Sequence, residues 1–194
     1  MKKALFVLLT SLVVFTLFGC TKGSGKPAGG KTASGKTYIL GDSGPADGIV
    51  FYDKKEYTHG WRYLEAAPAS TEFSAEWGSY TFVGGTEIAA GSGKRNTELI
   101  VEVLGEDGKA AQLCANLDVN GHKDWFLPSM IELDLMYKNL KSKGLGSFQD
   151  DWYWSSSASE YGSMAAWAQR FNDGSRNDYN HKGSVYFVRA VRAF

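Results

Sequence analysis

The apolar residues of the chain fall into three patterns, and each predicts a different structure. The first pattern is a run from residue 4 to residue 18, which follows Lys2 and Lys3 and ends at Gly19 and Cys20. A short apolar run that follows basic residues and ends at a small residue is typical of a signal peptide. The run is marginal for a helix that spans a membrane, which needs about 20 residues. We therefore expect residues 1–19 to be a signal peptide outside the fold.

The second pattern consists of short apolar and aromatic runs separated by turn residues, which predicts β-strands. These runs are residues 38–40, 49–52, 61–66, 152–157, 166–171 and 185–191. The glycine-rich stretch from residue 77 to residue 93 predicts a long loop. Within 166–171, the alternation of side chains predicts that Trp167 and Phe171 are buried, while Ala168 and Arg170 point outward.

The third pattern is apolar residues at helical spacing. One helix is predicted over Leu99–Leu104, with Asn96 or Thr97 as its cap, and another over residues 110–117. The most specific local signal is Ser129 followed by Glu132, because this spacing is a capping box in which each side chain bonds the other residue's backbone N–H. An apolar stripe follows this capping box and completes a third helix: Met130, Leu133, Met136, Tyr137 and Leu140.

The order of these elements is strands, then helices, then strands again, without alternation of single strands and helices. This order favours an α+β fold with a mostly antiparallel sheet and two main helices. We also expect the strands near 38–40 and 188–191, at the two ends of the domain, to lie together.

The residues that flank the fold predict how the chain is organised. Leu17-Phe18-Gly19-Cys20 resembles a lipobox, the signal for attaching lipid to Cys20, and the alternative is an ordinary signal peptide. Residues 21–36 are small, polar or basic, a composition typical of a flexible linker. We therefore expect a lipoprotein signal peptide (1–19), a lipidated Cys20 with a flexible linker (20–36), and one ligand-binding domain (37–194).

Charge and cysteine content exclude some classes of protein. The chain has 21 basic and 21 acidic residues, and loss of Lys2 and Lys3 with the signal peptide leaves it slightly acidic. Proteins that bind nucleic acid carry a clear basic excess, so we expect no nucleic-acid partner. We expect a membrane association through the lipid on Cys20. Cys114 is the single cysteine of the domain and cannot form an internal disulfide.

The sequence contains only incomplete versions of catalytic and metal-binding motifs. Gly91-Ser92-Gly93-Lys94 lacks the earlier glycine and the following Ser or Thr of a phosphate-binding loop. The three histidines lie far apart and predict no zinc site. Asp173, Ser175 and Asn177 imitate the start of a calcium loop that then fails at Asp178 and Ser184. Cys114 lies in an apolar helical stripe, which favours a buried, unreactive thiol. We predict no enzyme activity, no cofactor and no metal.

The segment between residues 155 and 186 has a composition typical of a binding surface, since Tyr and Arg alternate there with Ser, Gly and Asn. We predict that one exposed face binds an unknown protein or glycan ligand. The predicted ligand-binding residues are Tyr161, Arg170, Asp173, Arg176, Asp178, Tyr179, His181 and Tyr186. The alternative is that Tyr179 and Tyr186 fold inward as part of the core.

Six motifs in order carry a resemblance to a known family. They are Gly48-Ile49-Val50-Phe51-Tyr52-Asp53, Gly60-Trp61-Arg62-Tyr63-Leu64-Glu65-Ala66-Ala67-Pro68, Gly91-Ser92-Gly93-Lys94-Arg95-Asn96-Thr97, Asp124-Trp125-Phe126-Leu127-Pro128-Ser129, Tyr153-Trp154-Ser155-Ser156-Ser157 and Val188-Arg189-Ala190-Val191-Arg192-Ala193-Phe194. Together they resemble the C-terminal domain of bacterial collagen-like adhesins and their lipoprotein relatives. Within that group, the chain is most similar to treponemal-type variable lipoproteins diversified by retroelements.

This resemblance implies a C-type-lectin-like fold of the formylglycine-generating-enzyme type, and a surface lipoprotein that acts as a receptor or adhesin. It also implies that residues 157–186 are the diversified segment. The alternatives are an enzyme of that fold or a calcium-dependent lectin. The enzymes of that type use a cysteine pair, and the domain has one cysteine. Calcium-dependent lectins use a Glu-Pro-Asn or Gln-Pro-Asp loop, which the chain lacks.

Overall fold

The computed structural model describes residues 35–194, and the expected signal peptide, Cys20 and almost all of the linker lie outside these residues. The strands are β1 (Ile49–Thr58), β2 (Trp61–Ala66), β3 (Phe73–Glu76), β4 (Trp152–Ala158), β5 (Ala165–Arg170), β6 (Arg176–His181), β7 (Val185–Val188) and β8 (Val191–Ala193). The helices are α1 (Gly93–Leu104), α2 (Ala110–Ala115) and α3 (Met130–Asn139), with 3₁₀ turns at Ala69–Thr71 and Lys141–Lys143.

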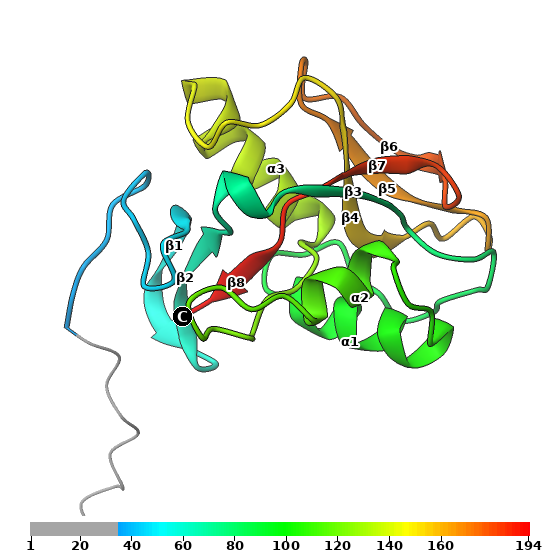
Figure 1. The fold of residues 1–194 in the computed structure, drawn as a ribbon, viewed down its shortest axis with the longest axis horizontal. Coiled ribbons are helices and arrows are strands. Elements are labelled where there is room, and N and C mark those ends of the chain that lie inside the picture. The colour runs from blue at the N-terminus through cyan, green and yellow to red at the C-terminus, as the bar shows by residue number, and fades with distance from the viewer. Residues whose placement is uncertain (1–34) are drawn as a thin grey trace, which may run out of the picture. The chain divides into compact units, whose positions relative to one another are not determined.

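The strands form two sheets. A three-stranded sheet has the order β1-β2-β8, and a five-stranded sheet has the order β3-β7-β4-β5-β6. All pairings are antiparallel except that of β4 with β7. The α+β class and the mostly antiparallel sheet expected from the sequence are therefore confirmed. Figure 1 shows α3 on one side of the five-stranded sheet, and α1 with α2 on the other.

Each face of the five-stranded sheet covers a different hydrophobic cluster. On one face, Trp154 and Ala168 pack with Ile100 of α1 and Cys114 of α2. On the other face, a second cluster joins the sheet to α3 and to the three-stranded sheet, and includes Phe51, Leu64, Leu133, Met136, Tyr153 and Phe171. Burial on both faces explains why the prediction for Ala168 was wrong: it has no exposed surface, although Arg170 does point outward. Trp167 is only half-buried.

The capping box of α3 is confirmed. Ser129 is the N-cap and Glu132 the third helical residue; the Ser129 hydroxyl accepts from the Glu132 N–H, and Glu132 Oε2 accepts from the Ser129 N–H at 2.7 Å. Glu132 Oε1 also accepts from the Gly91 N–H at 2.8 Å, so its buried carboxylate fixes the chain just before α1. Burial raises the pKa of Glu132, while these hydrogen bonds oppose that rise.

The predicted start of α1 was wrong. The helix begins at Gly93 after Ser92, and Asn96 and Thr97 are buried within it. Their side chains bond to other segments: Asn96 Oδ1 accepts from the Glu87 N–H at 2.9 Å, and Thr97 Oγ1 accepts from the Leu127 N–H at 3.0 Å. Residues that resemble caps in the sequence therefore hold neighbouring loops against the helix.

The two ends of the described chain meet, but not as paired strands. Residues 38–40 form no strand, so that prediction was wrong. Instead, the Tyr38 ring lies 5.3 Å from the rings of both Tyr63 and Phe194. The strand expected over 185–191 is also divided: β7 belongs to the five-stranded sheet and β8 to the three-stranded sheet, with Arg189 and Ala190 between them.

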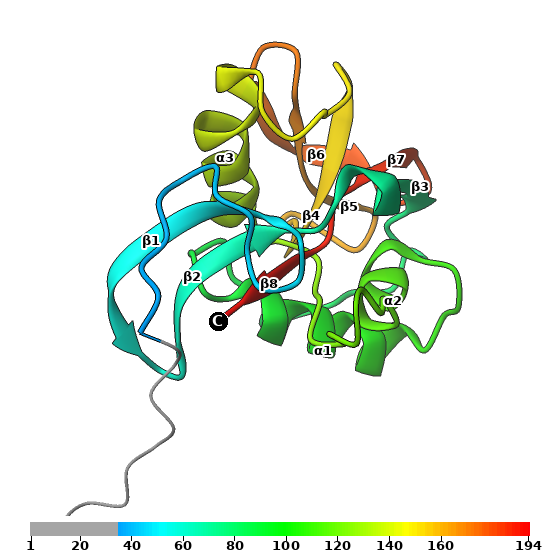
Figure 2. The same ribbon diagram turned by 60° about the vertical axis from the view of Figure 1, so that its left-hand side comes forward.

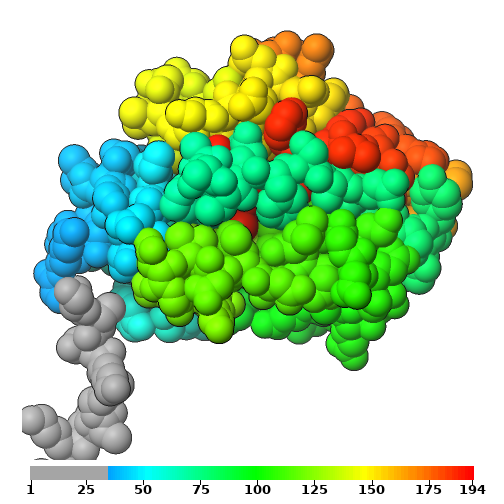
Figure 3. All heavy atoms as spheres, in the orientation of Figure 1, coloured from blue at the N-terminus to red at the C-terminus, as the bar shows by residue number. Residues whose placement is uncertain are grey.

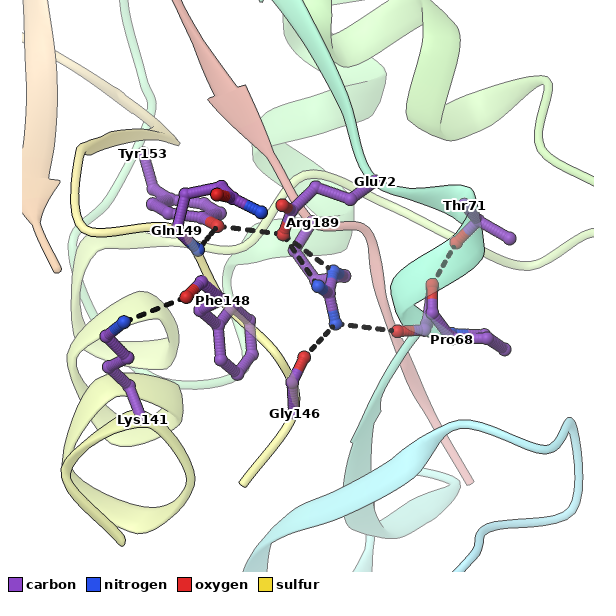
Figure 4. A network of polar contacts seen from close by, with 10 residues as sticks. Pro68, Thr71, Glu72, Lys141, Gly146, Phe148, Gln149, Tyr153 and Arg189 are labelled. Atoms are coloured by element: carbon purple, nitrogen blue, oxygen red, sulfur yellow. Dashed lines mark hydrogen bonds and ion pairs between the residues drawn. The ribbon is translucent and has the colours of Figure 1, made fainter. Parts of the chain in front are cut away.

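Arg189 lies at this change of sheet and is 1% exposed (Figure 4). Its guanidinium donates to Glu72 Oε2 at 2.6 and 3.1 Å, and to the carbonyl oxygens of Ala67 and Gly146 at 3.2 and 3.1 Å. The Tyr153 hydroxyl donates to the same Glu72 oxygen at 2.8 Å. The buried charge is therefore paired, and its donors reach two separate segments, the β2–β3 connection at Ala67 and Glu72 and the loop at Gly146.

Replacement of Arg189 with Met should lower the free energy of unfolding by about 3–5 kcal/mol, because it leaves the Glu72 carboxylate buried without its cation. Urea denaturation measures the change. Lys55→Met is the control, since it breaks an ion pair whose lysine is 80% exposed and should cost no more than about 0.5 kcal/mol. A loss below about 1 kcal/mol for Arg189→Met would contradict the role given to this ion pair.

Candidate display surface

The predicted ligand-binding residues lie on or beside the β5–β6 hairpin at the edge of the five-stranded sheet. β6 was not predicted as a strand, because its sequence Arg-Asn-Asp-Tyr-Asn-His contains only one apolar side chain. It pairs with β5 and ends the sheet on that side. The tight turn between them requires glycine at Gly174, where φ is 78° and a Cβ would lie 2.5 Å from the Tyr137 ring.

Tyr161 and Tyr179 form one exposed group. Their rings stack at 6.1 Å with an interplanar angle of 20°, and the residues are 79% and 74% exposed. Met164, which is 58% exposed, precedes β5 and accepts a backbone hydrogen bond from Lys182, the residue after β6. An aromatic pair that protrudes into solvent contributes little to the core and offers apolar area to a partner.

His181 extends this group onto a distant segment. Its ring lies 4.7 Å from that of Tyr80, and its Nδ1 lies 3.1 Å from the Tyr80 hydroxyl. Tyr80 is 50% exposed and belongs to the long loop before α1. Tyr80 was not among the predicted residues, because nothing in the local sequence indicates that a loop residue 101 positions away borders the hairpin. In Figure 3, the red C-terminal strands meet the blue-green atoms near residue 80 at one end of the molecule.

Arg170, Asp173 and Arg176 form a second exposed group, at the turn of the hairpin. Arg170 and Asp173 lie 3.9 Å apart, and Arg176 lies 3.4 Å from Asp134 of α3. Asp134 is largely buried and is also paired with Lys138 at 2.7 Å. Hydrogen bonds from Ser175 and the charge of Arg170 lower the pKa of Asp173. Arg176 and His181 stand at the two ends of β6, five residues apart, which corresponds to roughly 17 Å in a strand.

Two of the eight predicted residues are not on an exposed face. Asn177 pairs with Ala168 and Asn180 with Ala166, so β6 has one extra residue between these pairs. This bulge leaves Asp178 only 7% exposed and turns Tyr179 outward. Tyr186 is half-buried: its ring lies 4.5 Å from that of Trp154, and its hydroxyl donates to Asn180 Oδ1 at 3.3 Å. For Tyr186, the alternative of a partly inward side chain is correct.

The free edge of β6 is occupied in part by its own side chains. Asn177 Oδ1 accepts from the Tyr179 N–H at 3.2 Å, and the Asn180 amide donates to the Asn177 carbonyl at 2.9 Å. Backbone groups on an edge strand otherwise invite pairing with another chain. Two backbone groups in the middle of β6 are therefore already bonded, which disfavours the addition of a strand at that point.

Lys182 fixes the long loop against the end of the hairpin. The residue has no exposed surface, its ammonium lies 4.4 Å from the centre of the Trp77 ring, and it donates to the Thr81 carbonyl at 2.9 Å. Burial lowers the pKa of Lys182 to about 8. This contact holds the loop that carries Tyr80 beside His181.

The described residues contain no metal-ligand cluster and no membrane-spanning helix. No group of three or more His, Cys, Asp or Glu side chains within residues 35–194 could hold a metal ion. No helix in the same range is long and apolar enough to cross a membrane. Cys114 is fully buried, which confirms the prediction of a structural thiol, and burial raises its pKa.

The fold and this surface define an α+β domain whose mostly antiparallel sheet carries exposed aromatic and arginine side chains at one edge. The chain belongs to the Lcl C-terminal domain family, whose model matches residues 51–192. At the level of the family, this membership agrees with the resemblance found in the sequence motifs. No curated protein matches the chain.

A similar fold occurs in a fimbrial protein from Bacteroides ovatus ATCC 8483, for which a crystal structure at 1.85 Å resolution is known. The TM-score is 0.53 at 14% sequence identity, and the likeness covers 78% of this chain. The chain spans less than half of the fimbrial protein, since the likeness covers 45% of that chain. At this identity, the comparison bears on the fold alone.

Lys182 should make the stability of the domain depend on pH. Because the folded pKa of about 8 lies below the ordinary value of 10.5, the folded state binds fewer protons between these values, and stability rises with pH there. Relative to a Lys182→Met variant, the native chain should gain up to about 3 kcal/mol between pH 8 and 10.5. Chemical denaturation of both proteins at several pH values measures this gain. An equal stability difference at pH 7.5 and pH 10 would contradict the prediction.

Proposed function

We propose that this protein is a surface adhesin or receptor whose domain binds a protein or glycan ligand, and that it is not an enzyme. The observation that carries the proposal is the stacked Tyr161–Tyr179 pair, which is more than 70% exposed on an edge of the sheet. Membership of the Lcl C-terminal domain family and the fold shared with a fimbrial protein support a role at the cell surface.

The ligand face consists of the two exposed groups of the β5–β6 hairpin together with Tyr80. Tyr and Arg are enriched among the residues that contribute most to binding energy at interfaces. The aromatic group supplies apolar contact area, and Arg170 and Arg176 supply planar hydrogen-bond donors. Asp178 is left out of the face because it is buried, and Tyr186 acts as support beneath it.

The proposal includes a C-type-lectin-like arrangement of the domain. The support is that Tyr38, near the start of the described chain, packs against Phe194 at its end, and that helices lie on both sides of the larger sheet. It also includes a lipid anchor at Cys20, followed by a linker that holds the domain away from the membrane. Mass spectrometry of the protein from its own membrane tests this anchor, and an unmodified Cys20 would refute it.

We further propose that a retroelement diversifies the segment from residue 157 to residue 186. Tyr161, Tyr179 and His181 lie in this segment, and their exposed side chains are not part of either hydrophobic cluster. Sequencing of the flanking DNA tests the idea. A near-copy of the 3′ coding segment that differs only where it has adenine supports it, and the absence of any such copy would refute it.

Alanine replacement of Tyr161 and Tyr179 tests the ligand face. Binding partners are first selected with the native protein, on a glycan array and on immobilised bacterial and host surface proteins. The double variant should then bind the selected partner about thirtyfold more weakly, which corresponds to about 2 kcal/mol, at an unchanged melting temperature. Tyr57→Ala, which removes an exposed tyrosine from β1, is the matched control and should leave affinity unchanged. Equal affinity of all three proteins would place the ligand elsewhere.

A further inference from the structure

A small pocket opens where the loop before α1 passes the end of β4 and the middle of β5. It has a volume of about 250 Å³, and its lining includes Glu87, Ile88, Ala158, Glu160 and Trp167. Pockets for drug-sized ligands measure roughly 300–1,000 Å³, so this one has the size for a single side chain. Figure 2 shows β4 and β5 between α3 and the pair of α1 and α2, and Trp167 packs against the hydrophobic cluster that includes α3.

Among the described residues, Trp167 is the one tryptophan whose ring has neither an aromatic nor a cationic partner. Each of the other five packs against a tyrosine ring or lies beside a Lys or Arg side chain. The indole N–H groups of Trp77, Trp125 and Trp154 donate to backbone carbonyls, whereas within residues 35–194 that of Trp167 makes no hydrogen bond. Because Trp167 is only half-buried, its ring is open to a ligand.

Both charged residues of the pocket are acidic. Glu87 and Glu160 are exposed, and neither forms an ion pair within residues 35–194. Among the described residues, no Lys, Arg or His lines this pocket. Arg95 lines a neighbouring hollow that Glu87 also borders, but the two side chains are not paired. Two unpaired carboxylates beside an aromatic ring favour a cation.

The wall that carries Glu87 is held through its backbone and not through its carboxylate. The Glu87 N–H donates to Asn96 Oδ1 at 2.9 Å, and the Glu87 carbonyl accepts from the Asn96 amide at 2.6 Å and from the Ser157 hydroxyl at 2.9 Å. Thr86 Oγ1 accepts from the Ala158 N–H at 3.0 Å. These bonds fix the loop against α1 and β4, and a substitution of the Glu87 side chain leaves them in place.

We propose that this pocket, here called the Trp167 pocket, takes the cationic end of a Lys or Arg side chain from the protein ligand of the display surface. The Trp167 ring contacts the ammonium or guanidinium, and Glu87 and Glu160 neutralise its charge. Tyr161 directly follows Glu160, so the pocket adjoins the exposed aromatic group. The inference rests on the proposed function, and it narrows the ligand to a protein with a basic side chain at the contact.

Titration with single blocked amino acids tests the pocket before any ligand is identified. The isotope-labelled full chain is titrated with N-acetyl-lysine methylamide or N-acetyl-arginine methylamide, and NMR follows the indole N–H signal of Trp167, assigned by its absence in Trp167→Phe. This signal should shift saturably. N-acetyl-norleucine methylamide, which has the carbon chain of lysine without the ammonium, should not shift it. Binding of the cations should weaken between about 50 and 500 mM salt, since both carboxylates are exposed.

Removal of the two negative charges locates the site. The double variant Glu87→Gln/Glu160→Gln should bind both cations about fivefold more weakly, at an unchanged melting temperature. Glu98→Gln/Glu102→Gln removes the same charge from exposed positions on α1 and is the matched control, which should bind as the native protein does. The inference is overturned if the Trp167 signal does not shift saturably, if the norleucine derivative shifts it equally, or if Glu87→Gln/Glu160→Gln leaves the affinity unchanged.

The partner selected for the display surface separates this inference from the proposed function. That partner should also bind Glu87→Gln/Glu160→Gln more weakly. An unchanged affinity of this variant, with loss of binding by Tyr161→Ala/Tyr179→Ala, would overturn the inference and leave the proposed function standing. Selection of a glycan alone would overturn it as well. If no partner binds the native protein, the proposed function fails, while the titration still decides whether the pocket takes a cation.

Discussion

The buried ion pair between Arg189 and Glu72 is the constraint on which the arrangement of the two sheets depends. Burial of a guanidinium removes its hydration, which destabilises the folded state unless other hydrogen bonds replace it. Arg189 finds these bonds where Glu72 and the carbonyls of Ala67 and Gly146 converge. Ala67 and Glu72 belong to the connection between β2 and β3, and Gly146 to the loop before β4, so Arg189 ties both to the point where the chain passes from β7 to β8. The network thereby joins the five-stranded sheet, which carries the hairpin, to the three-stranded sheet.

Most of the elements could be predicted from apolar periodicity, and the failures have local physical reasons. β2 and α3 were predicted because one has a dense apolar run and the other a complete capping box. β6 was not predicted because an edge strand needs no apolar face. The strand predicted over 185–191 was too long, because the chain changes sheet at Arg189 and forms two strands there. The start of α1 was misplaced because the side chains of Asn96 and Thr97 serve tertiary contacts that have no signature in the local sequence.

The candidate surface was predictable in composition but not in geometry. The abundance of Tyr and Arg indicated a display segment, and Tyr161, Tyr179 and His181 are indeed exposed. The burial of Asp178 follows from a bulge that only the pairing with β5 reveals. Tyr80 could not be found from the sequence, because Lys182 brings its loop to the hairpin through contacts between distant residues.

The partly occupied edge of β6 has a consequence for how this hairpin tolerates change. Asn177 and Asn180 bond two backbone groups of the strand, the Tyr179 N–H and the Asn177 carbonyl, and these two side chains are not the ones that protrude. Substitutions at the protruding positions 176, 179 and 181 leave these two side chains in place. The outward chemistry of the hairpin can therefore vary while the middle of its edge stays occupied, so that recognition and protection of the edge fall to different residues of one short strand.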